Sequence, residues 1–379
     1  MDTLYFIPET FVEYIALSIL SLAFLCQMFY FLFFFNRTGS KKQSAQSTDF
    51  PPVSVVICAK NEEANLSRFL PYILNQDYPN FEVVVVNDCS QDDSEIILAQ
   101  FKTQYPHLYY TSLPYDKIFT HGKKLPLTVG IKAAKNEHLV FTDADCRPID
   151  NLWLKRVVAG FVPDVEIVLA HGAYEKKAGF LNRLIRYDSF LIATQYLGYA
   201  LAKVPYMGVG RNMAYKKSLF IKAGGFKNHN NVLSGDDDLF ISEAATKKNV
   251  AVVKQPDART ISLPVEKWSY YVHQKLRHLS TSPLYKFKIK FLLGLEVFSR
   301  ELFYAGVIFS AIFPNFVFIT LAFVLIRTTT KLIVLSRSAK NLGEGRVFWS
   351  SLYFDILLPF MYVLFLIENR FRKRVSSWK

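Results

Sequence analysis

The chain of 379 residues is poor in cysteine and in charged residues for its size. Its four cysteines (Cys26, Cys58, Cys89 and Cys146) form no Cys-x-x-Cys pair and have no accompanying histidine spacing. The sequence therefore indicates neither a disulfide framework nor a structural zinc site, and a reducing compartment is the simpler interpretation. Charged residues make up only 20% of the chain, whereas 51% is hydrophobic. This balance excludes a disordered chain and indicates that part of the protein lies in lipid.

Acidic residues are too few to balance the basic ones. Lys and Arg number 45 against 32 Asp and Glu, which gives a formal net charge of +13. Such an excess suits nucleic acid, an anionic membrane surface or a phosphorylated substrate. The basic residues gather beside the apolar segments, and no interleaved aromatic and basic motif is present. The pattern favours an anionic bilayer face and predicts no binding of nucleic acid.

The first long apolar run is Phe11 to Phe35. At about 1.5 Å per residue it is long enough to cross a hydrocarbon core of about 30 Å, which predicts a transmembrane helix at residues 11–35. The preceding residues are acidic and basic residues follow, the reverse of a cleaved signal peptide. By the positive-inside rule, residues 1–10 lie outside the cytoplasm, and residues 36–50 form a linker on the cytoplasmic side.

The second apolar region lies near the C-terminus. We expect two or three transmembrane segments within residues 299–368, and we favour three, one of them interfacial or re-entrant. A basic interfacial segment precedes this region and a basic tail follows it. The predicted interfacial segment is residues 283–298 and the predicted tail is residues 369–379. The predicted apolar segments are residues 299–313, 316–335 and 348–367, with a break near Pro314-Asn315 between the first two.

Residues 51–282 alternate between strand-like and helix-like patterns. Val53 to Ala59, Glu82 to Val86 and His138 to Thr142 are β-branched or apolar runs of strand length. Helix-start signals follow the first two runs, with Asn61 as the expected N-cap of the first helix. Strand and helix in alternation predict an α/β fold with a parallel sheet.

Acidic residues follow two of these strands. Asp88 follows the second strand, and Asp143 and Asp145 follow the third. Because ligands of open parallel sheets bind beyond the carboxyl ends of the strands, these acids should face one crevice. Carboxylate oxygens suit Mg²⁺ or Mn²⁺, which take their other ligands from water and phosphates. On Asp143-Ala144-Asp145 alone, a solvated turn with helix-capping acids before Pro148 is the favoured interpretation.

Three consecutive acids, Asp236, Asp237 and Asp238, stand before an expected helix from Leu239 to Lys248. Adjacent carboxylates repel one another unless a cation, a helix N-terminus or a catalytic role offsets the repulsion. Either they only favour the start of the helix, or one of them is a general base near a metal.

Seven short segments have a recurrent order. They are Pro52 to Glu62, Val86 to Ser90, Gly122-Lys123, Asp143-Ala144-Asp145, Gly208 to Ala214, Gly235 to Leu239 and Gln274 to Arg277. In this order they resemble the family-two inverting glycosyltransferases, over roughly residues 51–282. With the flanking apolar helices, the chain is similar to the membrane-anchored bacterial branch that includes the cellulose and hyaluronan synthases.

The resemblance implies a GT-A fold, a doubly wound and mostly parallel sheet that binds a nucleotide-diphosphate sugar, flanked by N-terminal and C-terminal transmembrane helices. It also implies a multi-pass protein of the inner (cytoplasmic) membrane with its catalytic domain in the cytoplasm. The donor would be a nucleotide-diphosphate sugar, with a UDP-sugar as the first candidate. The acceptor would be lipid-linked or a glycan.

The nucleotide-sugar site is also carried over from the resemblance. Asp88 matches the aspartate that recognises the nucleotide base, Ala59 and Glu62 line the same pocket, and Lys123 lies close to the nucleotide. Asn212 falls on the wall between donor and acceptor.

The resemblance further implies a metal site and a catalytic base. Asp145 matches the acid of the DxD motif that binds Mg²⁺ or Mn²⁺, with Asp143 toward the ribose or sugar. The base of the family lies in a Glu-Asp pair, which matches Asp236, with Asp237 as the alternative.

Two departures from the family bear on the product. Gln274 and Arg277 match the motif that holds the diphosphate in processive synthases, but His278 replaces its tryptophan. The C-terminal apolar region is also short for a polysaccharide channel. The sequence therefore predicts a membrane-bound, metal-dependent transferase that moves one sugar at the cytoplasmic face. The alternatives are a processive polysaccharide synthase and a non-catalytic scaffold of an envelope-glycan assembly complex. Sugar selection or core packing could explain Met207, Tyr215 and His171, and packing is favoured.

Overall fold

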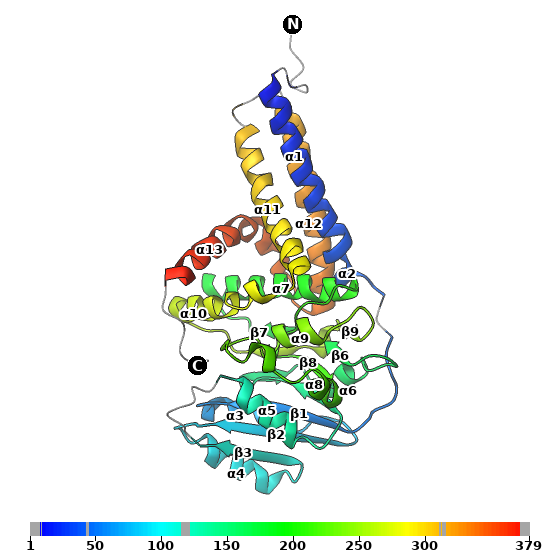
Figure 1. Cartoon of the computed structure of the whole chain (residues 1–379), viewed down its shortest axis with the longest axis vertical. Coiled ribbons are helices and arrows are strands. Elements are labelled where there is room, and N and C mark those ends of the chain that lie inside the picture. The colour runs from blue at the N-terminus through cyan, green and yellow to red at the C-terminus, as the bar shows by residue number, and fades with distance from the viewer. Residues whose placement is uncertain are drawn as a thin grey trace.

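A computed structural model describes residues 8, 10–42, 45–114, 122–310, 312 and 316–371. An α/β domain forms one end of the molecule, and long helices project from the other (Figure 1). Most of the predicted N-terminal segment 1–10, the predicted break at Pro314-Asn315 and most of the predicted tail 369–379 lie outside the described residues.

The domain is built on a seven-stranded sheet with the order β3-β2-β1-β4-β8-β6-β9. Strands β3, β2, β1 and β4 pair in parallel, whereas β8 runs antiparallel to both β4 and β6. The predicted mostly parallel α/β sheet is confirmed. The strands are β1 (Val53–Ala59), β2 (Phe81–Asp88), β3 (Leu108–Leu113), β4 (His138–Phe141), β6 (Ile167–Leu169), β8 (Met213–Lys216) and β9 (Val250–Val252). A second sheet has the order β5-β10-β7, formed by Cys146–Pro148, Thr260–Ser262 and Gly172–Tyr174.

Short helices cover the sheet, and two of the predicted starts need correction. Asn61 is not the N-cap of the first helix: its φ is 51°, and the helix begins at Glu63 after Glu62. The Asn61 side chain instead accepts a hydrogen bond from the Gln91 backbone N–H at 2.8 Å, which joins two loops. The helix expected at 239–248 is α9, Asp238–Ala244. The others are α3 (Glu63–Leu74), α4 (Ser94–Gln104), α5 (Lys124–Ala133), α6 (Trp153–Val158), α8 (Lys217–Lys222), η2 (Lys227–His229) and η3 (Pro256–Ala258).

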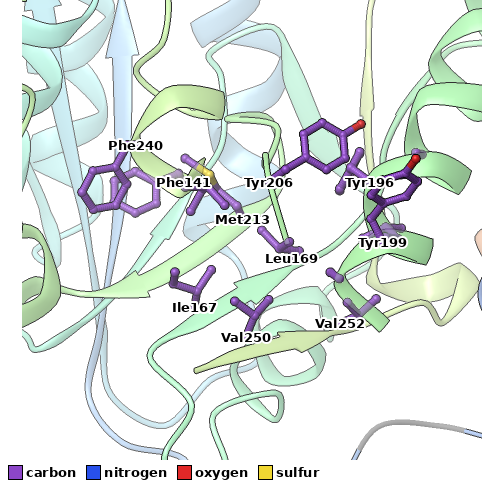
Figure 2. Packing of buried hydrophobic residues seen from close by; sticks show 14 of the residues in the cluster. Phe141, Ile167, Leu169, Tyr196, Tyr199, Tyr206, Met213, Phe240, Val250 and Val252 are labelled. Atoms are coloured by element: carbon purple, nitrogen blue, oxygen red, sulfur yellow. The ribbon is translucent and has the colours of Figure 1, made fainter. Parts of the chain in front are cut away.

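Helix α7 (Phe180–Leu201) lies between the sheet and the projecting helices (Figure 1). Most of its side chains are buried on both sides, which explains why its apolar residues show no single stripe. Figure 2 shows Tyr196 and Tyr199 of α7 beside the strand residues Leu169 and Val252. Tyr199 also stacks on Phe34 with ring centroids 4.1 Å apart, so one core runs from the sheet into the helices.

The projecting helices are α1 (Phe11–Phe29), α11 (Phe287–Ser310) and α12 (Val317–Leu342), and α13 (Ser351–Phe371) lies across them (Figure 1). Within the described residues, three helical stretches are long and apolar enough to cross a membrane: Phe11–Gly39, Val317–Leu342 and Val347–Phe365. Helix α11, where a span was expected, is not among them; it carries Glu296, Arg300 and Glu301. The remaining elements are η1 (Tyr30–Phe35), α2 (Asn36–Gly39), α10 (Trp268–Leu279), η4 (Ser282–Leu284) and η6 (Val347–Ser350).

Charged side chains are buried where these helices meet. Asp355 Oδ2 lies 2.8 Å from Arg327 Nη1 and 3.0 Å from Lys331 Nζ, and Asp355 Oδ1 lies 3.7 Å from Arg300 Nη1. Gln27 of α1 accepts a further hydrogen bond from Arg327 at 2.8 Å. We call Arg300, Arg327, Lys331 and Asp355 the bundle cluster. It links α11, α12 and α13, and Arg300 also pairs with Glu296 at 3.6 Å. Buried charges need such partners to offset their desolvation.

Candidate functional site

Asp143 and Asp145, which follow β4, lie at the carboxyl edge of the sheet, where two cavities meet; Asp88, the last residue of β2, ends at the same edge but lines neither cavity, contrary to the expectation of one shared crevice. The outer cavity, of about 800 Å³, is lined by Glu62, Asp143 and Asp145 among others. The inner cavity, of about 290 Å³, is lined by Asp236 and by residues of α7, α10, α11 and α13. The two share the following lining residues: Lys123, Asp143, Tyr174, Arg211, Gln274 and Arg277.

The predicted base-binding residues lie deeper than their neighbours. Ala59 and Asp88 are fully buried at the ends of β1 and β2, and neither lines the outer cavity. Lys60 Nζ lies 3.4 Å from Asp88 Oδ2. Glu62, at 6% exposure, does line this cavity. The structure therefore brings Glu62 to the cavity surface and places Asp88 behind it.

Asp143 and Asp145 form the candidate metal site. Ligand atoms of Asp143, Asp145 and Cys146 all lie within 4.8 Å of one another. Burial, together with the charge of Asp143, raises the pKa of Asp145 to about 6. A divalent cation fits this pair, because it would offset the repulsion and because Mg²⁺ and Mn²⁺ prefer carboxylate oxygens. Burial raises the pKa of the Cys146 thiol well above its usual value, so this residue stays neutral and is a poor ligand for either ion.

Lys123 connects the metal site to the acids before α9. Its Nζ lies 2.6 Å from Asp143 Oδ1 and 3.6 Å from Asp236 Oδ2. Burial opposes the charged ammonium, but Asp143 and Asp236 outweigh burial and raise the pKa of Lys123 well above its usual value. Burial also acts against ionised Asp143, yet the ion pair with Lys123 outweighs it and lowers the pKa of Asp143. Lys123 and Asp143 are therefore both charged near neutral pH.

The three adjacent acids have different partners. Asp238 accepts hydrogen bonds from the hydroxyls of Thr281 and Tyr285, which hold it in place. Asp237 caps α9 through the Asp238 backbone N–H and also accepts a bond from the Gly210 N–H, both at 2.8 Å. Asp236 forms no hydrogen bond through its carboxylate within the described part of the chain, and it lines the inner cavity. Asp236 is therefore the acid available to a ligand.

The pKa of Asp237 is raised by burial and by its two neighbouring acids. Burial, followed by the charges of Asp236 and Asp238, raises its pKa to about 7. The helix cap and the Gly210 N–H oppose this rise but do not cancel it. Asp237 is thus partly protonated near neutral pH, although a general base must be ionised to accept a proton.

Asn212 does not lie on the cavity wall where the sequence placed it. Asn212 is 1% exposed and lines neither cavity. Its side chain donates to the carbonyls of His171 and Ala258 at 2.8 Å and accepts from Trp153 at 3.1 Å. Asn212 therefore joins three segments of the domain behind the cavity wall and does not lie on the wall between donor and acceptor, where it was expected.

Arg211, which the sequence analysis did not single out, lines both cavities. Its guanidinium lies 4.1 Å from the centre of the Tyr174 ring and donates to Ser189 Oγ at 3.3 Å. The available signal was its position beside Asn212 in the Gly208 to Ala214 segment.

The candidate sugar-selecting residues divide between core and cavity. Tyr215 is fully buried and stacks on Phe141 with ring centroids 4.3 Å apart, as the packing alternative predicts. Met207 and His171 line the inner cavity, and His171 Nε2 lies 2.8 Å from Glu344 Oε1 in the loop after α12. Gln274 donates to the Tyr174 hydroxyl at 3.1 Å on the wall shared by the cavities, and Arg277 and His278 follow it on α10.

Comparisons with known proteins agree with this architecture. Residues 54–224 match the family model described as Glycosyl transferase family 2. Glycosyltransferase AglE of Haloferax volcanii is 30% identical over 200 residues, which cover 50% of this chain and 60% of AglE. Probable glycosyltransferase YdaM of Bacillus subtilis is 25% identical over 239 residues, which cover 60% of this chain and 54% of YdaM. The chain thus spans little more than half the length of these relatives.

A solved structure shows the same fold. It is the mannosyltransferase PcManGT from Pyrobaculum calidifontis, in complex with GDP-Man and Mn²⁺, with a TM-score of 0.56 and 19% identity over 87% of this chain and 98% of that one. Together the comparisons support a glycosyltransferase enzyme with a GT-A-like fold. The family match ends at residue 224 and does not cover Asp236 or Arg277.

Proposed function

We propose that the protein is a membrane-bound inverting glycosyltransferase. It would move a sugar from a nucleotide-diphosphate sugar, with a UDP-sugar as the first candidate, to a lipid-linked or glycan acceptor at the cytoplasmic face. The observation that supports this proposal is the arrangement of Asp143, Lys123 and Asp236. They form one chain of charges at the junction between an outer cavity large enough for a nucleotide and an inner cavity for an acceptor.

In the proposed reaction, the acceptor hydroxyl lies in the inner cavity beside Asp236. Asp236 removes the hydroxyl proton while the oxygen forms a bond to the anomeric carbon of the donor. The bond from that carbon to the diphosphate breaks on the opposite face, and its electron pair leaves with the nucleoside diphosphate. Attack opposite to the leaving group inverts the configuration at the anomeric carbon.

The other residues of the site orient the donor and stabilise charge. Asp143 and Asp145 would hold Mg²⁺ or Mn²⁺, which when bound supplies positive charge to the diphosphate. Lys123 and Arg277 stand on the wall common to the two cavities and would place further positive charge beside the leaving group. Glu62 in the outer cavity would contact the nucleoside.

The test uses purified full-length protein, membrane extract as a source of acceptors, Mn²⁺ or Mg²⁺ and a panel of labelled sugar nucleotides. Transfer of label from one donor to the organic fraction, or to a short glycan, supports the proposal. Label in high-mass product would instead support processive synthesis, which the replacement of tryptophan by His278 disfavours. Absence of both transfer and metal-dependent nucleotide binding would support the scaffold alternative.

A further inference from the structure

Asp188 is a buried acid of the inner cavity that the proposed reaction does not use. It lies on α7, is 1% exposed, and lines the cavity together with Lys275 of α10 and Tyr362 of α13. In Figure 1, α10 and α13 lie next to α7 on the bundle side of the sheet domain. Because a buried carboxylate is costly without close partners, the groups around Asp188 indicate what it does.

The partners of Asp188 come from two other helices. Its Oδ2 forms an ion pair with Lys275 Nζ and accepts a hydrogen bond from the Tyr271 hydroxyl at 3.3 Å, and both partners belong to α10. Its Oδ1 accepts a hydrogen bond from the Tyr362 hydroxyl of α13. Asp188 therefore joins three helices at one point. We call Asp188, Tyr271, Lys275 and Tyr362 the Asp188 clamp.

Helix α10 also carries two side chains of the candidate site. Tyr271 and Lys275 are four residues apart in the helix, which places both on the face that meets Asp188. Gln274 and Arg277 lie on the adjoining face and line both cavities. Because a helix moves as a unit, the contacts of Asp188 with one face of α10 set the position of Gln274 and Arg277 on the other.

Helix α13 connects this clamp to the bundle. Asp355 of the bundle cluster and Tyr362 of the Asp188 clamp lie about two turns apart on α13. The Tyr271 ring of α10 also packs edge-on against Phe365 of α13, with ring centroids 6.2 Å apart. The position of α10 therefore depends on α13 as well as on α7.

We infer that Asp188 is a positioning residue of the proposed reaction. Through Lys275 and Tyr271 it holds α10 where Arg277 can reach the leaving diphosphate, and through Tyr362 it ties this position to the bundle. The inference rests on the proposed function and adds to it a residue that acts through α10. Misplacing a catalytic group by about 1 Å can lower a rate about 100-fold, so support of this kind bears directly on transfer.

The test compares diphosphate and monophosphate binding to the full-length protein in detergent, by calorimetry with Mn²⁺. The probes are UDP with UMP and GDP with GMP, and the pair that the wild type binds is used. Asp188→Asn removes the charge of the clamp, whereas Tyr362→Phe removes a single hydroxyl. Asp77→Asn is the matched control, because Asp77 forms an ion pair with Lys155 at 2.8 Å on the surface.

We expect Asp188→Asn to weaken diphosphate binding about 10- to 100-fold and monophosphate binding little, because Arg277 stands beside the leaving diphosphate in the proposed function. Tyr362→Phe should weaken diphosphate binding about 2- to 10-fold, as the loss of one hydrogen bond does. Asp77→Asn should change neither. In protein that already carries Arg277→Gln, Asp188→Asn should have little further effect on diphosphate binding, because the clamp acts through Arg277.

Three outcomes overturn the inference. Equal losses for diphosphate and monophosphate would show that the clamp only stabilises the fold. Full additivity with Arg277→Gln would show that Asp188 acts without Arg277, and unchanged diphosphate binding in both clamp variants would show that the clamp is not needed. If Asp188→Asn does not fold, Tyr362→Phe provides the same comparisons.

These outcomes leave the proposed function intact, because they concern only the support of α10. A wild-type protein that binds no nucleotide with Mn²⁺ would instead contradict the proposed function, and the inference with it.

Discussion

Two clusters of buried charged side chains in the protein carry charge of opposite sign in excess. In the bundle cluster, Arg300, Arg327 and Lys331 surround the single carboxylate of Asp355. At the sheet edge, five acids (Asp143, Asp145, Asp236, Asp237 and Asp238) line the two cavities that Lys123 also lines, and among the described residues Lys123 pairs with Asp143 and Asp236. In the bundle cluster each cation contacts an acid, which offsets desolvation and supports a structural role, whereas the excess negative charge at the sheet edge costs stability and is typical of a site that receives a cation or a proton.

Replacing the proposed base tests the catalytic half of this comparison. Asp236→Asn should lower transfer about a thousandfold, because general base catalysis contributes about 10² to 10⁴. Stability and Mn²⁺-dependent nucleotide binding should stay close to those of the wild type, since Asp236 carries no hydrogen bond that the fold needs. Transfer rates and nucleotide calorimetry on the same preparation check both parts. Full turnover in this variant would move the base to another residue.

Removing the central acid of the bundle tests the structural half. Asp355→Asn leaves three cations buried without their shared partner, so we expect a loss of about 3–5 kcal/mol in the free energy of unfolding. Glu266→Gln is the control: Glu266 pairs with Lys177 at 2.8 Å on the surface, where solvent screens the pair and the loss should be far smaller. Denaturant unfolding in detergent measures both. Equal losses would mean that the bundle cluster is solvated.

The candidate metal site should respond through affinity. Asp145→Asn removes the charge of a proposed metal ligand, so the nucleotide affinity measured with Mn²⁺ should fall about 100-fold. Losing a residue that only orients a metal ligand already lowers metal affinity by up to about 100-fold. Nucleotide binding measured in EDTA should be equally weak for the variant and the wild type. A variant that keeps the wild-type response to Mn²⁺ would place the ion elsewhere.

The smallest expected effect concerns Asp237. The folded protein raises the pKa of Asp237 to about 7, so protonated Asp237 favours the folded state. This contribution to stability is complete below the pKa that Asp237 has in the unfolded chain, and it is lost as the pH rises through about 7. Asp237→Asn keeps a good helix cap and removes the charge. At pH 8 the variant should be as stable as the wild type or up to about 1 kcal/mol more stable. Thermal unfolding at pH 5 and pH 8 tests this sign; a clear loss at pH 8 would show that the ionised carboxylate stabilises the fold.

Much of the sheet and part of the site could be predicted from local pattern. The β-branched run at Val53 to Ala59 is a fully buried parallel strand, and the acids after β2 and β4 lie at the same sheet edge. These features depend on residues close in the sequence and on the geometry of parallel sheets. The N-cap was placed wrongly at Asn61 because this residue is held by the loop of Gln91, 30 positions later. The membrane orientation and the domain boundaries stay predictions.

The positions of the strands and of the acids beside them follow from local pattern, because strand periodicity and the order of strand and acid are properties of neighbouring residues. Which of the three adjacent acids is available to a ligand depends instead on tertiary contacts. Asp238 is held by Thr281 and Tyr285, and Asp237 by Gly210, contacts that join residues far apart in the sequence. In the same way, long-range packing buries Asn212 and turns Arg211 toward the cavities, since burial and hydrogen bonding depend on neighbours that only folding brings together.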